Sequence, residues 1–329
     1  MANPVVRRLI AAAKLLLGIA LLVAVVRFLS PDLASLRERA SLDLGFLALA
    51  FVCTLCASII TSARWMLMVE AMGGTRLPYA VYFHGLVLTK VVGHFTSALA
   101  MDLVGRGIAL RSAGSERGLG HSMTQVIVER LFDLLLPASL VVWALTVRSV
   151  DPSPTVVALS FAGICLLFAV LAALILWPLA RTALHLYLTI SDWRGRTVDP
   201  ATREALLAAP ITRRVAGQVG ALSVLRYIAV FGQFWAVAAA IGVELNFRTI
   251  ASAMPVGQLA GILGVTPGGL GIQEAGWAGA FRWLGVLDDP SIGLFVLSQR
   301  ALIFAFFAVL TLLSWPWLRR IRARMIEPA

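Results

Sequence analysis

The part of this chain best suited to bind an anion is the segment Thr266-Pro-Gly-Gly-Leu-Gly-Ile-Gln-Glu-Ala275. Pro267 lacks a backbone N–H. Gly268, Gly269 and Gly271 can adopt backbone angles that most residues avoid. We therefore predict a break in the backbone, followed by a helix whose first N–H groups and positive dipole end face that break. Such a helix start is suited to bind an anion. The alternative is a tight turn or kink with a packing role only.

A second set of chemically capable residues lies within another apolar segment. Gln125, Glu129 and Asp133 are spaced i, i+4 and i+8, so they share one helix face. Charged side chains inside a membrane point into the protein and pair with one another. Arg130 and Arg106 are the expected partners. The face is either an ion-paired structural element or part of a substrate path, and both interpretations stay open.

Histidine and cysteine show no pattern typical of catalysis or metal binding. The four histidines lack a metal-ligand spacing such as H-E-x-x-H. Cys53 and Cys56 form a C-x-x-C pair, but they lie inside an apolar segment without a βαβ context. We therefore predict no cofactor, no metal and no enzymatic activity. An integral-membrane transferase that acts on lipid headgroups is kept as an alternative.

Composition places these residues in a membrane protein. Of 329 residues, 60% are hydrophobic, and the mean hydropathy is +0.88. This balance is outside the range of soluble domains of similar length. The net charge is +11, but the arginines cluster at the ends of apolar segments. Anionic headgroups and the positive-inside rule explain that pattern better than nucleic acid, which we do not expect as a partner.

Membrane-spanning helices must position the candidate residues. A bilayer core of about 30 Å takes about 20 apolar residues to cross. Arg64 and Trp65, near the end of the second span, are expected at the membrane interface. Six segments of the chain are long enough, namely residues 9–29, 44–69, 122–147, 155–180, 215–241 and 291–317.

Two further apolar stretches are interrupted. Residues 251–265 and 272–284 predict two short helices on either side of the glycine-rich break. Such a break at membrane depth requires shielding by protein or by a water-filled cavity. Residues 79–102 contain several polar groups and glycines, and we predict a re-entrant hairpin that turns near residues 92–94. A polar span that faces the bundle interior is the alternative.

Charge bias predicts the orientation. The basic segments 102–117 (predicted as a loop), 181–214 and 319–324 are expected in the cytoplasm. The predicted localisation is the cytoplasmic membrane, with both termini inside. Residues 181–214 hold a short amphipathic piece, 201–209, and are expected to lie on the membrane surface.

The predicted fold is an all-α, polytopic membrane protein of one domain, residues 1–329. Span, hairpin and span occur twice with opposite topology, in residues 44–147 and again in residues 215–317, with the basic linker 181–214 between them. Inverted repeats with broken helices are a recurring architecture of membrane transporters. The evidence for the repeat is hydropathy and charge, not identity between the two halves.

Several motifs resemble one known family. The Pro267 to Ala275 segment resembles the Pro-Gly-Gly…Glu-Ala signature of the flippase-like membrane domain of lysylphosphatidylglycerol synthases and their stand-alone relatives. Arg64-Trp65 agrees with this family. So does the pattern Asp102…Arg106 followed by Glu129-Arg130-Leu131 and Asp133, although Asp102 and Arg106 are one residue further apart than usual. The resemblance spans about residues 8–320, and a lysyl-transferring domain is not expected.

The resemblance implies a flippase-like protein that moves a polar-headed lipid between leaflets. Relatives are associated with aminoacyl-phospholipids, polyprenyl-linked sugars and hopanoid-type lipids, and anionic phospholipid is a further candidate. A membrane enzyme partner or a homo-oligomer is possible. An accessory subunit that presents lipid to a partner enzyme is the alternative function.

We expect the headgroup to enter a polar cavity between the two halves while its tails stay in lipid. Its phosphate would meet the N–H groups of Gly268 and Gly269 and the guanidinium of Arg300. Glu274 would pair with Arg300 in the empty site or contact a cationic headgroup. The expected lipid-binding residues are Thr266, Gly268, Gly269, Gly271, Glu274, Arg300, Glu129, Arg130, Asp133, Asp102 and Arg106.

Overall fold

Helices make up all the regular structure in the described part of the chain. Five of these helices are long and apolar enough to cross a membrane, so the chain is an all-α polytopic membrane protein. They match five of the six predicted spans, while the first, residues 9–29, lies almost wholly outside the described residues. The computed structural model describes residues 42–74, 76–96, 100–115, 119–193, 203–204, 212–263 and 266–326, with scattered positions between 16 and 27.

Helix α3 (Leu44–Ala71), in the first half of the described chain, has a capped start. The side chain of Asp43 accepts hydrogen bonds from the N–H groups of Gly45 and Phe46, which satisfies two of the unpaired donors at this helix start. The helices of this half are α3 (Leu44–Ala71), α4 (Tyr79–Phe95), the π-helix η1 (Met101–Gly105), α6 (Arg106–Ser112) and α7 (Leu119–Val150). We refer to α4, η1 and α6 as the first hairpin.

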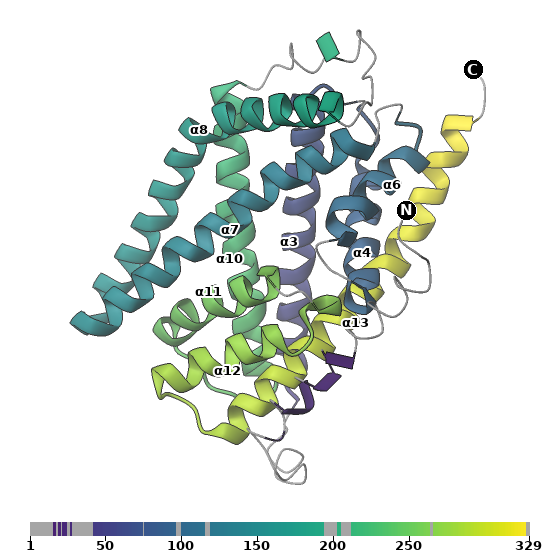
Figure 1. Cartoon of the computed structure of the whole chain (residues 1–329). Coiled ribbons are helices and arrows are strands. Elements are labelled where there is room, and N and C mark those ends of the chain that lie inside the picture. The colour runs from purple at the N-terminus through teal and green to yellow at the C-terminus, as the bar shows by residue number, and fades with distance from the viewer. Residues whose placement is uncertain are drawn as a thin grey trace.

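The second half repeats this order of long and short helices. A linking helix, α8 (Pro154–Trp193), contains Pro178, and Figure 1 shows its last part running across one end of the bundle. The predicted amphipathic piece at 201–209 lies outside the described residues except for 203–204. The remaining helices are α10 (Arg213–Ala240), α11 (Phe247–Leu263), the 3-10 turn η2 (Pro267–Gly269), α12 (Ile272–Leu284) and α13 (Asp289–Ile326). We refer to α11, η2 and α12 as the second hairpin.

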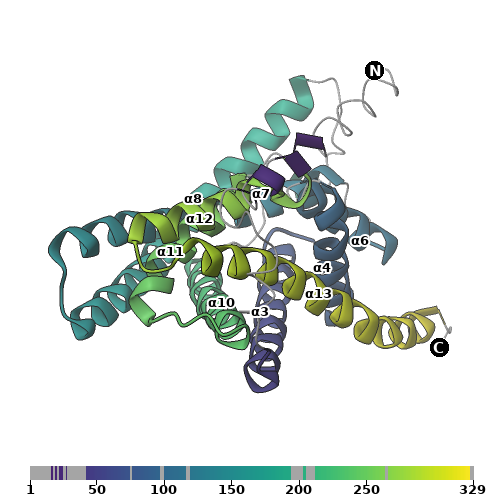
Figure 2. The ribbon, with the colours of Figure 1, turned by 90° about the horizontal axis from the view of Figure 1, so that it is seen from below.

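The two halves pack against each other reciprocally. Helices α3 and α10 run antiparallel, because the N–H of Asp43 donates to the carbonyl of Ala240 at 2.8 Å while Arg64 bonds Ser223 at 2.9 Å. Helix α4 packs on α13, and its counterpart α11 packs on α7. Figures 1 and 2 show α4 lying alongside α13, and α11 lying alongside α7. This arrangement is the one that the predicted inverted repeat leads us to expect.

The links between helices sort to two ends of the bundle. Arg248, at the start of α11, pairs with Asp151, which follows α7. The guanidinium of Arg148 lies 4.5 Å from the ring centroid of Trp283 near the end of α12. The α7–α8, α10–α11 and α12–α13 links therefore share one end. The last part of α8 and the start of α10, which flank the predicted cytoplasmic linker, lie at the opposite end of the bundle in Figure 1.

Small residues let the two arms of the second hairpin approach closely. Trp277 is completely buried among Phe234, Phe281 and Phe295. A Cβ at Gly257 would collide with the Trp277 indole, so α11 can cross α12 at this distance only with glycine there.

The first hairpin differs from its prediction in two respects. The expected turn at residues 92–94 is wrong, because α4 continues through Phe95 and ends at Thr96. The ring of His94 bonds the carbonyl of Lys90 within the helix at 2.7 Å. The expected basic loop 102–117 is also wrong, since η1 and α6 keep it helical to Ser112. That the two hairpins are re-entrant stays a prediction.

Candidate functional site

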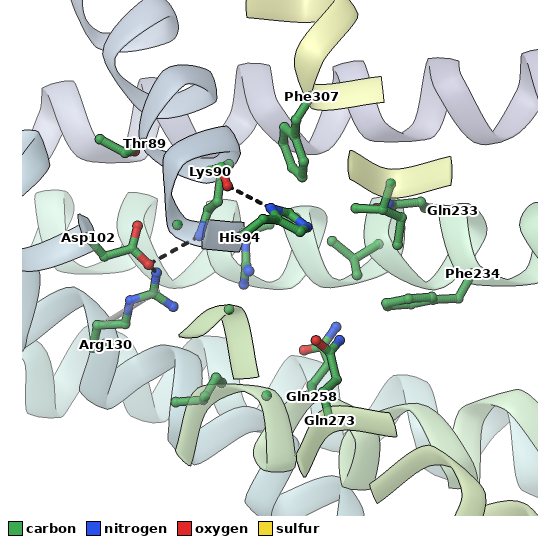
Figure 3. Close-up of a pocket in the computed structure, with 17 residues that line it drawn as sticks. Thr89, Lys90, His94, Asp102, Arg130, Gln233, Phe234, Gln258, Gln273 and Phe307 are labelled. Atoms are coloured by element: carbon green, nitrogen blue, oxygen red, sulfur yellow. Dashed lines mark hydrogen bonds and ion pairs between the residues drawn. The ribbon is translucent and has the colours of Figure 1, made fainter. Parts of the chain in front are cut away.

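A cavity of about 230 Å³, lined by both polar and apolar side chains, lies between the two hairpins. Both hairpins and helices α7, α10 and α13 contribute to its wall, so it lies between the two halves as expected. Figure 3 shows charged side chains on one side of this space and glutamines on the other. Its main polar lining residues are Thr89, Lys90, His94, Asp102, Arg130, Arg226, Gln233, Gln258, Gly268 and Gln273.

Arg64 lies behind this cavity and is completely buried. Its Nη2 donates to Glu129 at 2.5 Å, and its Nη1 donates to Asp133 at 2.8 Å and to Ser223 at 2.9 Å. The predicted position of Arg64 and Trp65 at the membrane interface is therefore wrong. Helix α3 turns these side chains inward because Arg64 finds two carboxylates there, whereas in lipid it would find none.

Arg106 is a second buried cation beside the cavity. Its Nη1 bonds Glu129 at 2.6 Å, and its Nη2 lies 3.3 Å from Asp102 one helical turn earlier. Its guanidinium also lies 5.3 Å from the centroid of Trp65. The predicted pairing of Arg106 with the acidic face of α7 is therefore confirmed.

Three further cations reach the cavity wall. Arg130 pairs with Asp102 and lies 3.6 Å from Asp133, which confirms it as the second expected partner. Lys90 pairs with Asp102 at 3.2 Å, and Arg226 pairs with Asp133 at 3.1 Å. The side chain of Gln125 is not among those described.

These residues form one network, which we call the charge cluster. Sequence reasoning did not include Lys90 and Arg226 among the site residues. A signal was present for both, because each is a cation within an apolar segment, and Arg226 shares a helix face with Gln233. The charge cluster consists of Arg64, Lys90, Asp102, Arg106, Glu129, Arg130, Asp133 and Arg226.

The accessible part of the charge cluster is cationic. The side chains of Lys90, Arg226 and Arg130 are 27%, 20% and 15% exposed. Each of the three carboxylates is at most 5% exposed. A molecule in the cavity therefore meets ammonium and guanidinium groups first, with the carboxylates behind them.

The tip of the second hairpin contacts the first hairpin. The N–H of Gly268 donates to the carbonyl of Thr96 at 2.6 Å, and the N–H of Gly269 donates to Thr266 at 3.0 Å. The N–H of Gly271 donates to Glu274 at 2.7 Å. The expected phosphate contact through the Gly268 and Gly269 N–H groups is therefore wrong for this conformation, because both donors are already used within the protein.

Arg300 holds this tip in place. It pairs with Glu274, the partner that the sequence predicted for it, and its Nη2 donates to the carbonyl of Gly268 at 3.0 Å. Glu274 and Thr266 are completely buried, and the Thr266 hydroxyl donates to the carbonyl of Leu270 at 2.7 Å. These side chains stabilise the turn, while Gly268 is the tip residue that lines the cavity.

The ion pairs of the two halves correspond. Asp102, in the second arm of the first hairpin, pairs with Arg130 of α7. Glu274, in the second arm of the second hairpin, pairs with Arg300 of α13. Each pair thus links the second arm of a hairpin to the long helix that follows it, a correspondence that an inverted repeat predicts.

Comparison with known proteins matches this architecture to one family. The family described as "Lysylphosphatidylglycerol synthase TM region" matches residues 12–311 of the chain. Among curated proteins and among solved structures, neither search gave a match.

Proposed function

The chain belongs to the lysylphosphatidylglycerol synthase TM-region family, and from this premise we propose that it is a lipid flippase-like transporter. The membership gives it a role connected with membrane lipids. In our proposal, the central cavity accepts the polar headgroup of a lipid and carries it between leaflets. The lipid tails stay in the surrounding bilayer.

The accessible positive charge of the cavity is the observation that carries this proposal. Ionisable side chains inside a membrane are costly and mark paths for substrates or ions. Here Lys90, Arg130 and Arg226 line the cavity, and the arginine guanidinium matches the geometry of a phosphate oxygen pair. A phosphate group would neutralise part of this excess. The lipid phosphate is therefore the natural ligand of this wall.

The inverted halves supply a route for the headgroup. In inverted-repeat transporters, one half rocks against the other around a central site. The Gly268–Thr96 hydrogen bond joins the two hairpins in this conformation, and the Glu274–Arg300 pair links the second hairpin to α13. We propose that a passing headgroup separates this tip contact, and that the contact re-forms after release.

Reconstitution tests this function directly. Purified protein in liposomes with fluorescent phosphatidylglycerol should raise the rate at which the lipid becomes accessible to a membrane-impermeant quencher. The Arg226→Gln variant should lower this rate. Arg203→Gln, which removes the charge of an exposed surface arginine, should not lower it. A rate equal to that of protein-free liposomes would contradict the proposal.

The same experiment addresses the alternatives. An accessory subunit that only presents lipid to an enzyme would not move lipid when purified alone. A transferase acting on lipid headgroups would convert the lipid when supplied with a group donor, and mass spectrometry of the lipid extract would detect the product.

A further inference from the structure

A second and smaller space, which we call the inner void, lies behind the cationic wall of the central cavity. Its volume is about 50 Å³, which gives room for about three waters. Ser58 and Thr61 of α3 line it, whereas no described residue of α3 lines the central cavity. Lys90, Arg130 and Arg226 line both spaces. These three cations therefore lie between the inner void and the central cavity.

The inner void is surrounded mainly by positive charge. Four cationic side chains line it, those of Lys90, Arg106, Arg130 and Arg226, together with one carboxylate, Asp133. The whole charge cluster holds five cations and three carboxylates, so two of its positive charges exceed its negative charge. A buried charge is costly unless an opposite charge lies beside it. An anion in the inner void would offset part of this excess.

Arg106 brings an unused donor to the inner void. Its side chain is 1% exposed, and its Nε has no hydrogen-bond partner in the part of the chain that the structure describes. Its Nη1 bonds Glu129 and its Nη2 lies near Asp102, so the Nε–H is left for a ligand. A buried N–H without an acceptor destabilises the folded state. Water or an anion in the inner void would accept a hydrogen bond from it.

Two hydroxyl groups line the inner void on the α3 side. Ser58 donates to the carbonyl of Thr54 at 2.7 Å, and Thr61 donates to the carbonyl of Ala57 at 2.6 Å. Each of these carbonyls also accepts the backbone N–H bond of the helix. A hydroxyl that turns towards the void therefore leaves no carbonyl unpaired. Ser58 and Thr61 can add two O–H donors to the N–H of Arg106.

Charge and size together favour a monatomic anion. Water would accept from Arg106, but it would leave the positive excess unchanged. A lipid phosphodiester would reduce the excess, but it carries a chain on either side of its phosphate and is larger than the void. A halide ion brings the negative charge and fits the volume of about 50 Å³ together with water.

We propose that the inner void binds a halide ion, and that chloride in this position is a fixed counter-ion of the charge cluster. Its ligands are the Nε–H of Arg106, the hydroxyls of Ser58 and Thr61, and the cations of the wall. The ion stabilises the folded bundle because it offsets the repulsion between these cations. This role is separate from lipid transport, since the ion lies behind the wall that a headgroup contacts.

Thermal unfolding of the purified protein in detergent tests the site. Midpoint temperatures are measured in sodium chloride, sodium bromide and sodium gluconate at equal ionic strength, so that general screening is the same. Gluconate is too large for the void. We expect midpoints several degrees higher in chloride and in bromide, and a rise with halide concentration, because the ion binds the folded state. Equal midpoints in the three salts would overturn the proposal and leave the void to water.

Substitutions on α3 test the location. Thr61→Val and, separately, Ser58→Ala remove one hydroxyl of the inner void, and α3 does not reach halides bound in the central cavity. Each variant should need about tenfold more chloride for the same rise in midpoint. Thr54→Val is the matched control, because Thr54 is buried on α3 and donates to the carbonyl of Ala50 at 2.8 Å, but does not line the void. It should keep the wild-type chloride response. The same response in all three variants would overturn the proposed site.

Discussion

Arg64 stabilises the buried carboxylates of the charge cluster. It is completely buried, and it is the residue that bonds both Glu129 and Asp133 at distances below 3 Å. Removing one partner of a buried ion pair costs about 3–5 kcal/mol, because the other charge is left uncompensated. In contrast, Arg203 forms an exposed pair with Asp192, and such pairs contribute about 0–1 kcal/mol.

We therefore expect Arg64→Met to destabilise the protein strongly. Thermal unfolding in detergent should show a large drop in the midpoint temperature, and Arg203→Met should leave it almost unchanged. Arg64→Lys should fall between them, because lysine keeps the charge but loses the planar fork that bonds two carboxylates. A melting curve for Arg64→Met that matches the Arg203→Met control would show that the network does not depend on Arg64.

Single residues show where sequence reasoning succeeds. The helical spacing of Glu129 and Asp133 predicted their shared face, and their partners Arg106 and Arg130 were identified correctly. Arg64 was expected to face the membrane interface because it lies near the end of a span, whereas the structure buries it inside the helix bundle. Distance along a helix does not reveal which side of that helix a residue occupies, and the partners of Arg64 are distant in sequence.

At the scale of elements, the turn of the second hairpin depends on glycine. Gly268 has a φ of +60°, which side-chain-bearing residues rarely adopt, and a Cβ there would lie 2.7 Å from Arg300 and 2.9 Å from the carbonyl of His94. A side chain would therefore strain the backbone and separate the two hairpin tips.

We expect Gly268→Ala to lower both the unfolding temperature and the rate of lipid transport. The matched control is Gly279→Ala, because Gly279 lies inside α12 and a Cβ there meets nothing within 4 Å. That control should be as stable as the wild type or slightly more stable, since alanine favours helix by about 1 kcal/mol. Equal behaviour of the two alanine variants would show that the tip contact is dispensable.

The sequence located the helices of the second hairpin better than those of the first. Helix α12 begins and ends where predicted, because Gly271 and Gly285 mark its boundaries. The first hairpin has neither proline nor a glycine pair at its turn, and Gly93 suggested a break inside what is a continuous helix. Residues 101–112 are helical, and Asp102 and Arg106 form ion pairs there with residues of α4 and α7. The composition of this segment alone did not predict these contacts.

At the scale of the whole molecule, opposite topology of the two halves predicts sidedness. The α7–α8 and α12–α13 links share one end of the bundle, opposite the end where α8 finishes and α10 begins. Hydropathy and charge predicted this sorting. The reciprocal packing of α4 on α13 and α11 on α7 was beyond prediction, since it depends on contacts between distant parts of the chain.

Cysteine accessibility tests the orientation. In a variant whose native cysteines (Cys53, Cys56 and Cys165) are replaced, Ser153→Cys and Asp289→Cys should both react with an impermeant thiol reagent applied outside intact cells. Arg203→Cys should react only after the membrane is permeabilised. Labelling of Ser153→Cys and Asp289→Cys from opposite sides would contradict the inverted arrangement.

The most direct test of the account is a charge series in the transport assay. Lys90→Gln and Arg226→Gln each remove one accessible positive charge and leave Asp102 and Asp133 with other cationic partners. We predict that transport of fluorescent phosphatidylglycerol falls with each single change and falls further in the double variant, while folding persists. A double variant that folds and transports this lipid at the wild-type rate would show that the cationic wall does not bind the lipid phosphate.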